Sequence, residues 1–276
     1  MPTLQTKHNL APQTDLYYET YGVGRPVVLS HGWPLSGRMW EAQMFALKDA
    51  GYQVIAHDRR GFGQSGKTAT GYEYDTFASD LNDLMTQLDL RDVSLVGFSM
   101  GGGEVARYVG MFGTERLKNI VLLGAVTPYL LKTADNPDGS LTQAEVDDMA
   151  KQVQDGRIKF LTGLTTKFLN WEDNADKLGE DFLAFSKGLA YQASPVATVD
   201  SVYAFSETDF RADLAKFDVP TLVIHGDKDQ SVPLEASSQR VPQYIPHAKL
   251  EMIKGAPHGL AATHAEEVNK LILGFI

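Results

Sequence analysis

The sequence predicts an α/β fold in which a mostly parallel, doubly wound sheet carries an inserted helical cap. Short apolar runs alternate with helical patterns over residues 1–126, as they do when crossover helices join parallel strands. The alternation gives way to helical patterns alone over residues 127–209 and resumes over residues 210–276. The strand-like runs are apolar almost throughout, which is typical of strands buried on both faces. We therefore predict a core formed by the two outer segments and a cap formed by the middle one.

The first core segment contains both kinds of element in alternation. Its strand-like runs are PVVLS (26–30), YQVIAHD (52–58), VSLVGF (93–98) and KNIVLLGAV (118–126). Two stretches have apolar residues at the three- and four-residue spacing of a helix. One runs from Tyr74 to Leu88, and the other is GGGEVARYVGMFG, which follows the third run.

The cap segment has helical patterns without a convincing strand, most clearly in LTQAEVDDMAKQV, IKFLTGLTTKFL and DFLAFSKGLAY. Residues 127–210 hold 14 acidic and 7 basic side chains, so they carry −7 of the net charge of −10. Such charge is typical of the solvated outer face of helices. In the second core segment, the strands VPTLVIHG (219–226) and KLEMIKG (249–255) alternate with helices that begin at Leu234 and Ala262.

The composition excludes several classes of function. A net charge of −10 without a cluster of Lys and Arg disfavours phosphate backbones, so we expect no nucleic-acid partner. The chain has no cysteine, which excludes disulfides, a thiolate nucleophile and cysteine-ligated metals. The start MPTLQTKHNLAPQTD lacks the apolar segment of a signal peptide, and no run of about 18 apolar residues suits a membrane span. We expect a cytoplasmic protein that needs neither a membrane nor a metal.

The stretch LVGFSMGGG, residues 95–103, ends a predicted strand and begins a predicted helix. Its G-F-S-M-G segment fits the sharp strand-to-helix turn that presents a nucleophilic serine above a sheet. The residues on either side of such a turn approach each other closely, which explains Gly97 and Gly101. Ser99 would lie beside free helix amides that favour negative charge. A glycine-rich helix start capped by Ser99 is the structural alternative, but the strand before it and the helix after it favour a nucleophile.

A serine hydroxyl needs a base within hydrogen-bond reach, and in this turn type an acid and then a histidine follow the serine in the chain. The histidines after Ser99 are His225, His247, His258 and His264. Those at 225, 247 and 264 fall within a predicted strand, before the last strand and within the last helix. His258 lies in the loop GAPHGL after the last predicted strand, at the same edge of the sheet as Ser99. We therefore predict His258 as the base rather than as a solvated loop histidine.

The acid is expected after the preceding strand, where HGDKDQSVP offers Asp227 and Asp229. Asp227 directly follows the last glycine of that strand and is well placed to bond the amides of its own turn. Asp229 lies further along, where a loop can carry it towards His258. We favour Asp229, whose role would be to fix the tautomer of His258 and to stabilise the imidazolium without taking the proton.

Acyl transfer also requires hydrogen-bond donors for an oxyanion. One is the backbone amide of Met100, the residue after the nucleophile, and the other is expected in the loop HGWPL (31–35) after the first central strand. The Trp33 amide fits, because Gly32 lets the backbone approach and Pro34 has no N–H to donate. We assign the role to the backbone of Trp33 and expect its indole to serve in packing.

These segments resemble the α/β-hydrolases, and within them the cofactor-free haloperoxidases, aryl esterases and γ-lactamases. They lie in the expected order between residues 31 and 259: HGWPLSGRMW, DRRGFGQSG, GYEYDTFASDL, VGFSMGGGEVARYV, HGDKDQSVP and APHG. The resemblance implies an α/β-hydrolase fold with no cofactor and gives DRRGFG a structural part under the site. The site residues that it implies are the triad Ser99, Asp229 and His258 and the oxyanion donors Trp33 and Met100.

The resemblance further implies a serine hydrolase that acts on small carboxylic esters, lactones or amides through an acyl-enzyme. A serine at the nucleophile position favours acyl chemistry over the alkyl displacement of relatives that carry an aspartate there. Members with a proline after the oxyanion tryptophan, here Pro34, tend towards perhydrolysis. In that reaction hydrogen peroxide replaces water, and the peracid formed oxidises halide without a metal or haem. The residues that we expect to contact the substrate are Pro34, Val126, Ser231 and Leu234.

Two other functions retain the same triad. One is a small-molecule receptor on the hydrolase fold, and the other is a carbon–carbon bond hydrolase that acts on dione products. The latter usually needs polar or basic groups for an acidic substrate, which the acidic cap does not suggest. The resemblance also allows homo-oligomers, and no hydrophobic stripe in the sequence decides the oligomeric state.

Overall fold

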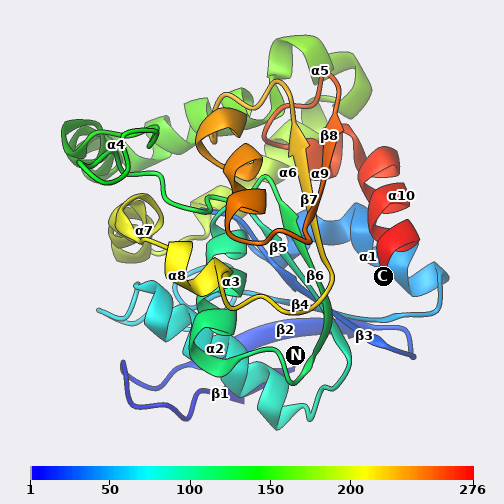
Figure 1. The fold of residues 1–276 in the computed structure, drawn as a ribbon. Coiled ribbons are helices and arrows are strands. Elements are labelled where there is room, and N and C mark those ends of the chain that lie inside the picture. Colours follow the sequence, from blue (N-terminus) through cyan, green and yellow to red (C-terminus); the bar gives the residue numbers. More distant parts are fainter. Residues whose placement is uncertain (1) are drawn as a thin grey trace.

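The computed structural model describes residues 2–276, and within them eight strands form one sheet in the order β1-β2-β4-β3-β5-β6-β7-β8 (Figure 1). Neighbouring strands from β4 to β8 run parallel, whereas β1 and β2 pair antiparallel at one edge. The strands are β1 (Thr3–Gln5), β2 (Asp15–Tyr21), β3 (Pro26–Ser30), β4 (Gln53–His57), β5 (Val93–Phe98), β6 (Leu117–Leu123), β7 (Thr221–Gly226) and β8 (Lys249–Ile253). This confirms the prediction of a mostly parallel sheet.

Helices flank the sheet and form a separate group between β6 and β7. The α-helices are α1 (Glu41–Asp49), α2 (Tyr74–Gln87), α3 (Met100–Phe112), α4 (Gln143–Leu169), α5 (Trp171–Leu178), α6 (Glu180–Tyr191), α7 (Pro195–Glu207), α8 (Arg211–Leu214), α9 (Leu260–Thr263) and α10 (Ala265–Phe275). The 3-10 helices are η1 (Gly37–Trp40), η2 (Leu234–Ala236) and η3 (Ser238–Gln243). Helices α1 and α10 lie on one side of the sheet and α2, α3 and α8 on the other (Figure 1).

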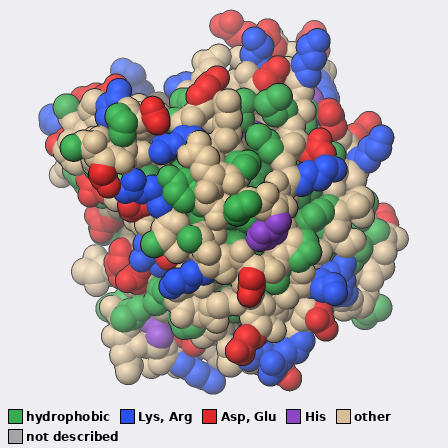
Figure 2. All heavy atoms as spheres, in the orientation of Figure 1, with side chains coloured by type: hydrophobic (Ala, Val, Ile, Leu, Met, Phe, Trp, Pro, Cys, Tyr) green, Lys and Arg blue, Asp and Glu red, His purple; other side chains and the backbone are tan. Residues whose placement is uncertain are grey.

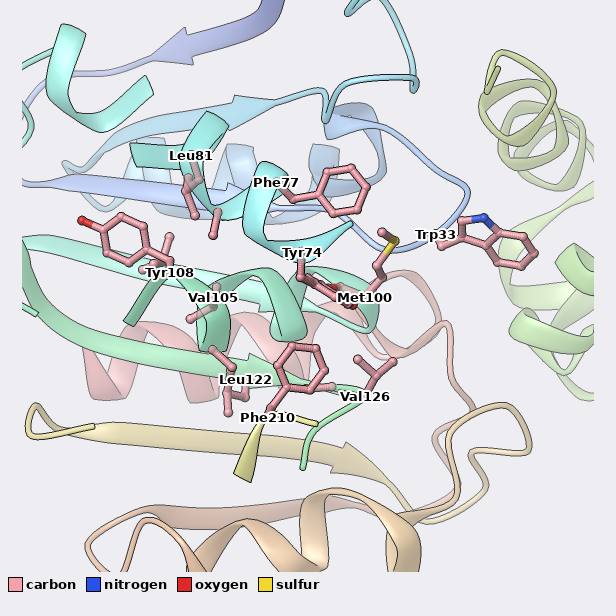
Figure 3. Close-up of a cluster of buried hydrophobic side chains, with 14 of the residues drawn as sticks. Trp33, Tyr74, Phe77, Leu81, Met100, Val105, Tyr108, Leu122, Val126 and Phe210 are labelled. Carbon is pink, nitrogen blue, oxygen red and sulfur yellow. The ribbon is translucent and has the colours of Figure 1, made fainter. Parts of the chain in front are cut away.

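Two buried clusters hold these layers together, one on each face of the sheet. Because strand side chains alternate between faces, Val28 of β3 enters one cluster and its neighbours Val27 and Leu29 enter the other. The first cluster joins the sheet to α2 and α3 and is drawn in Figure 3. At about 25 cal/mol per Å² of apolar surface buried, such clusters are the main source of stability.

The edge strands β1 and β2 were not predicted, although Tyr17, Tyr18, Thr20 and Tyr21 of β2 are residue types that favour strands. Strand β6 ends at Leu123, earlier than the predicted residue 126. The predicted last helix is divided at His264 into α9 and α10. Helices α4 to α7 lie within the predicted cap segment, while its boundaries at residues 127 and 209 stay a prediction.

The surface carries charges of both signs. Over the face drawn in Figure 2, Lys and Arg side chains are scattered among Asp and Glu, including on the lobe that α4 forms at the upper left. Among residues 2–276, no helix combines the length and apolar character needed to cross a membrane.

Candidate active site

Ser99 lies at the turn between β5 and α3, with φ of +53° and ψ of −119°. A non-glycine residue in this left-handed region is strained, and such strain occurs mainly at functional sites. A Cβ atom at Gly97 would collide with the carbonyl oxygen of Gly101, and one at Gly101 with that of Ser30. Both glycines are therefore needed for the close approach. The Ser99 hydroxyl makes no capping bond to the helix, unlike the N-cap serine of the structural alternative.

Three side chains far apart in the sequence meet at this turn. The Ser99 hydroxyl lies 2.9 Å from Nε2 of His258, and Nδ1 of His258 lies 2.6 Å from Oδ2 of Asp229. Because a carboxylate only accepts, Nδ1 carries the proton, which leaves Nε2 free to accept the hydroxyl proton. Ser99 and the side chains of His258 and Asp229 are nearly inaccessible to solvent. The structure thus brings together the three residues for which we predict a triad.

The Asp229 carboxylate is held by its own loop as well as by His258. Its Oδ1 accepts hydrogen bonds from the backbone amides of Ser231 and Val232, both at 2.8 Å. Burial alone would raise the pKa of Asp229, but the neighbouring His258 and His225 rings lower it well below its usual value. Asp229 is therefore an anion beside the imidazole, as stabilisation of an imidazolium requires.

Asp227 differs from what the sequence suggested. Its Oδ1 accepts the amide of Gly255 at 2.6 Å, in the loop after β8, instead of the amides of its own turn. The own-turn bonds belong to Asp229. Asp227 thus links the loop after β7 to the loop after β8, while Asp229 contacts His258.

The remaining candidate histidines are engaged elsewhere. His247 bonds the carbonyl of Val219, and His264 bonds the hydroxyl of Thr263. His225 is fully buried in β7, and its Nε2 lies 3.3 Å from Oδ2 of Asp229. The sequence analysis set His225 aside as a strand residue and missed this contact.

Of the two predicted oxyanion donors, Met100 follows Ser99 in the chain, and Trp33 lies in the loop whose Gly32 approaches the Ser99 side chain. Met100 is the first residue of α3, where amides have no partner within the helix. Its side chain packs beside Tyr74 and Phe77 (Figure 3), and the Tyr74 hydroxyl donates to its carbonyl at 3.0 Å. Trp33 lies in the loop after β3, and the peptide bond between Trp33 and Pro34 is cis.

The Trp33 indole joins this loop to the cap. Its Nε1 donates to the carbonyl of Thr198 in α7 at 3.1 Å, and its ring packs against Phe160 of α4 and Phe205 of α7. In Figure 3 the ring extends away from the core cluster towards the helices of the cap. The indole therefore ties the loop after β3 to α4 and α7.

A buried ion pair between Arg59 and Glu104 contacts the loop that contains Trp33. The Arg59 guanidinium bonds Glu104 of α3 through Nε at 3.0 Å and the carbonyl of His31 through Nη2 at 2.8 Å. The Arg59 backbone amide also donates to Nε2 of His31 at 2.9 Å. Burial alone would raise the pKa of Glu104, but Arg59 lowers it far below its usual value. DRRGFG thus links the loop to α3, in keeping with a structural part.

A cavity of about 950 Å³ opens onto Ser99 and His258. Most of its wall is apolar, whereas α4 adds acidic and lysine side chains. The apolar side chains are Trp33, Val126, Leu130, Leu141, Met149, Phe160, Leu164, Phe168, Phe205 and Val232. The cavity suits a ligand with substantial apolar surface.

The structure separates the four predicted substrate contacts. Val126 and Ser231 line the large cavity, and the buried Ser231 hydroxyl has no hydrogen-bond partner among residues 2–276. Pro34 lines a smaller cavity of about 50 Å³. Leu234 begins η2 and lines neither of these two cavities.

Comparison with known proteins agrees with this geometry. The family described as alpha/beta hydrolase fold matches residues 25–265. A non-heme chloroperoxidase of Kitasatospora aureofaciens is 44% identical over 283 residues, which cover 100% of this chain and 99% of that protein. A bifunctional esterase/perhydrolase of Acinetobacter calcoaceticus is 36% identical and covers 95% of this chain and 96% of that protein.

A solved structure supports the same family assignment. The crystal structure of a bromoperoxidase from Bacillus anthracis aligns with a TM-score of 0.93 at 51% sequence identity, and the alignment covers 99% of each chain. These findings confirm the resemblance that the motifs indicated. With a family match over most of its length and full-length relatives well above 30% identity, the chain belongs to the alpha/beta hydrolase fold family.

Proposed function

We propose that the protein is a serine hydrolase that cleaves small carboxylic esters, lactones or amides through an acyl-enzyme, and that also transfers the acyl group to hydrogen peroxide. The observation that carries this proposal is the unbroken chain of hydrogen bonds from Ser99 through His258 to Asp229, at 2.9 and 2.6 Å. Ser99 and His258, at one end of this series of hydrogen bonds, line a largely apolar cavity. The names of the chloroperoxidase and esterase/perhydrolase relatives support both activities.

In the first half of the reaction, the Ser99 hydroxyl attacks the carbonyl carbon of the substrate while its proton passes to Nε2 of His258. The negative charge that develops on the carbonyl oxygen is stabilised by the backbone amides of Trp33 and Met100. Asp229 stabilises the imidazolium through Nδ1. His258 then returns the proton to the departing alcohol or amine, and an ester of Ser99 remains.

In the second half, water or hydrogen peroxide gives a proton to His258 and attacks the ester of Ser99. Collapse of the second oxyanion expels the Ser99 oxygen, which takes the proton back from His258. Water yields the carboxylic acid, and hydrogen peroxide yields the peracid. Free peracid then transfers one oxygen atom to a halide ion, which gives the carboxylate and a hypohalous acid and needs no metal.

A panel of short acyl esters and lactones, each assayed with and without hydrogen peroxide, tests the proposal. We expect many turnovers of p-nitrophenyl acetate per enzyme molecule, together with peracid formation when peroxide is present. A single burst that stalls would instead indicate a receptor that retains the fold. Lack of turnover on every member of the panel would contradict the proposal.

The value of kcat/KM for a neutral ester should rise from the acidic side through a single ionisation, because a histidine base must be neutral to accept a proton. Asp229 adds no ionisation there, because its pKa lies below the ordinary value and it stays charged as the pH rises. Measurement requires conditions in which chemistry limits the rate. A flat profile from about pH 5 to 8 would contradict a histidine base.

Replacement of Pro34 by leucine should lower the ratio of perhydrolysis to hydrolysis. Proline restricts the preceding residue to an extended backbone, and no donor among residues 2–276 bonds the Trp33 carbonyl oxygen. We infer that this oxygen accepts a hydrogen bond from peroxide. Loss of one such bond changes the ratio roughly two- to twelvefold.

Both activities are measured on one acetate ester. An unchanged ratio would contradict the role of the Trp33 carbonyl. An equal fall in both rates would show that Pro34 acts only by shaping the oxyanion loop.

A further inference from the structure

We propose that His225 is a positioning residue that holds Asp229 in line with His258. This inference rests on the proposed acyl-transfer function, for which it names an additional residue. His225 is the penultimate residue of β7 and is fully buried. It does not line the large cavity, so its effect on catalysis must pass through Asp229.

The His225 ring bonds on both sides. Its Nε2 lies 2.9 Å from the carbonyl oxygen of Val232 and 3.3 Å from Oδ2 of Asp229. Because a carbonyl oxygen only accepts, Nε2 carries a proton that it donates to Val232, and the same N–H edge of the ring faces Oδ2 of Asp229. Nδ1 lies 2.8 Å from the hydroxyl of Ser238 at the start of η3. The ring therefore cannot rotate without losing both bonds.

These hydrogen bonds link His225, Asp229 and Val232, the last two of which lie in the loop after β7. The amide of Val232 donates to Oδ1 of Asp229, and the carbonyl of the same residue accepts from His225. Val232 is thus held between the carboxylate and a strand in the interior of the sheet. Without His225 the buried Val232 carbonyl would lack a partner, which is costly enough to make the loop rearrange.

Movement of the loop would affect catalysis because Asp229 has little freedom to compensate. Oδ1 is already used by two loop amides, and only Oδ2 faces His258, at 2.6 Å. A carboxylate that shifts with its loop lengthens this contact and turns the imidazole away from Ser99. A displacement of about 1 Å can cost roughly 100-fold in rate.

The test replaces His225 with phenylalanine, which keeps the ring but removes both nitrogens. We expect kcat for p-nitrophenyl acetate to fall about 10- to 100-fold while KM changes less than twofold, because the cavity is untouched. The proton NMR resonance of His258 Nδ1–H, which lies far downfield when bonded to a carboxylate, should shift upfield or broaden. His225→Gln restores an N–H within reach of Val232 and Asp229. It should recover most of kcat and most of the downfield His258 resonance.

Ile224→Val is the matched control, because Ile224 is the preceding residue of β7 and packs in the cluster on the opposite face. It removes one buried methyl group and should leave kcat and the downfield resonance unchanged. If the phenylalanine variant does not fold, Ser238→Ala carries the test. Loss of that one bond should lower kcat roughly two- to twelvefold.

Three outcomes would overturn the proposal. They are a folded His225→Phe protein with unchanged kcat and resonance, an equal loss in the Ile224→Val control, and no recovery in His225→Gln. The resonance is read without substrate, so it reports on the bond between Asp229 and His258 even if the wild-type protein proves inactive on esters. Failure of the proposed function and failure of this inference are therefore distinguishable.

Discussion

Replacing Ser99 with alanine is expected to abolish ester turnover while the protein stays folded. The substitution removes the oxygen that lies 2.9 Å from Nε2 of His258 and therefore removes the nucleophile. Substrate binding and the amides of Trp33 and Met100 would remain, so a residual rate of about 10³–10⁴-fold over the uncatalysed reaction can persist. The measurement is kcat on p-nitrophenyl acetate, with circular dichroism to verify the fold.

The control is the unchanged secondary structure and thermal midpoint of the variant. Alanine fits the space that serine leaves and keeps the same backbone at the turn, whose φ is +53° in the wild-type protein. A folded Ser99→Ala protein that hydrolyses esters at nearly the wild-type rate would remove Ser99 as the nucleophile. It would also leave the strained turn without a catalytic explanation.

Replacing Asp229 with asparagine should lower kcat by several orders of magnitude, about 10⁴-fold in the best-studied triad. The carboxylate accepts Nδ1–H of His258 at 2.6 Å and so leaves Nε2 free to take the serine proton. An amide nitrogen at that position would donate instead, and the imidazole would hold the wrong tautomer. The loss of charge also removes the stabilisation of the imidazolium.

Asp227→Asn is the matched comparison, because Asp227 lies two residues away on the same loop and bonds the Gly255 amide instead of a histidine. We expect it to lower the thermal midpoint with little change in kcat. If the Asp227 variant loses the rate and the Asp229 variant keeps it, the assignment of the acid is reversed.

Local sequence patterns predicted much of the fold. Apolar runs bounded by turn residues identified the central strands, and β3 and β5 begin and end where the sequence predicts. The turn at Ser99 was also predicted, since a close approach of backbones at Gly97 and Gly101 restricts those positions to glycine. These features depend on neighbours within a few residues, and a single sequence contains that information.

Other features depend on how distant segments pack. The sequence favoured Asp229 over Asp227 from its place in the loop, and the path of that loop in the structure brings Asp229 and not Asp227 to His258. The roles of both as catalytic or structural groups stay predictions for the variants above to test. The part of His225 was missed because a buried strand histidine looks the same in sequence whatever lies beyond the end of its strand.

The sequence by itself determined the fold class, the nucleophile turn and the order of the candidate groups along the chain, because each follows from local periodicity, backbone sterics or motif spacing. Only the tertiary structure decided which side chains meet, that Trp33 is tied to α7 through Thr198, and that Leu234 does not line the large cavity. Contacts between residues more than 100 positions apart depend on side-chain directions and loop paths that the whole packed molecule sets together.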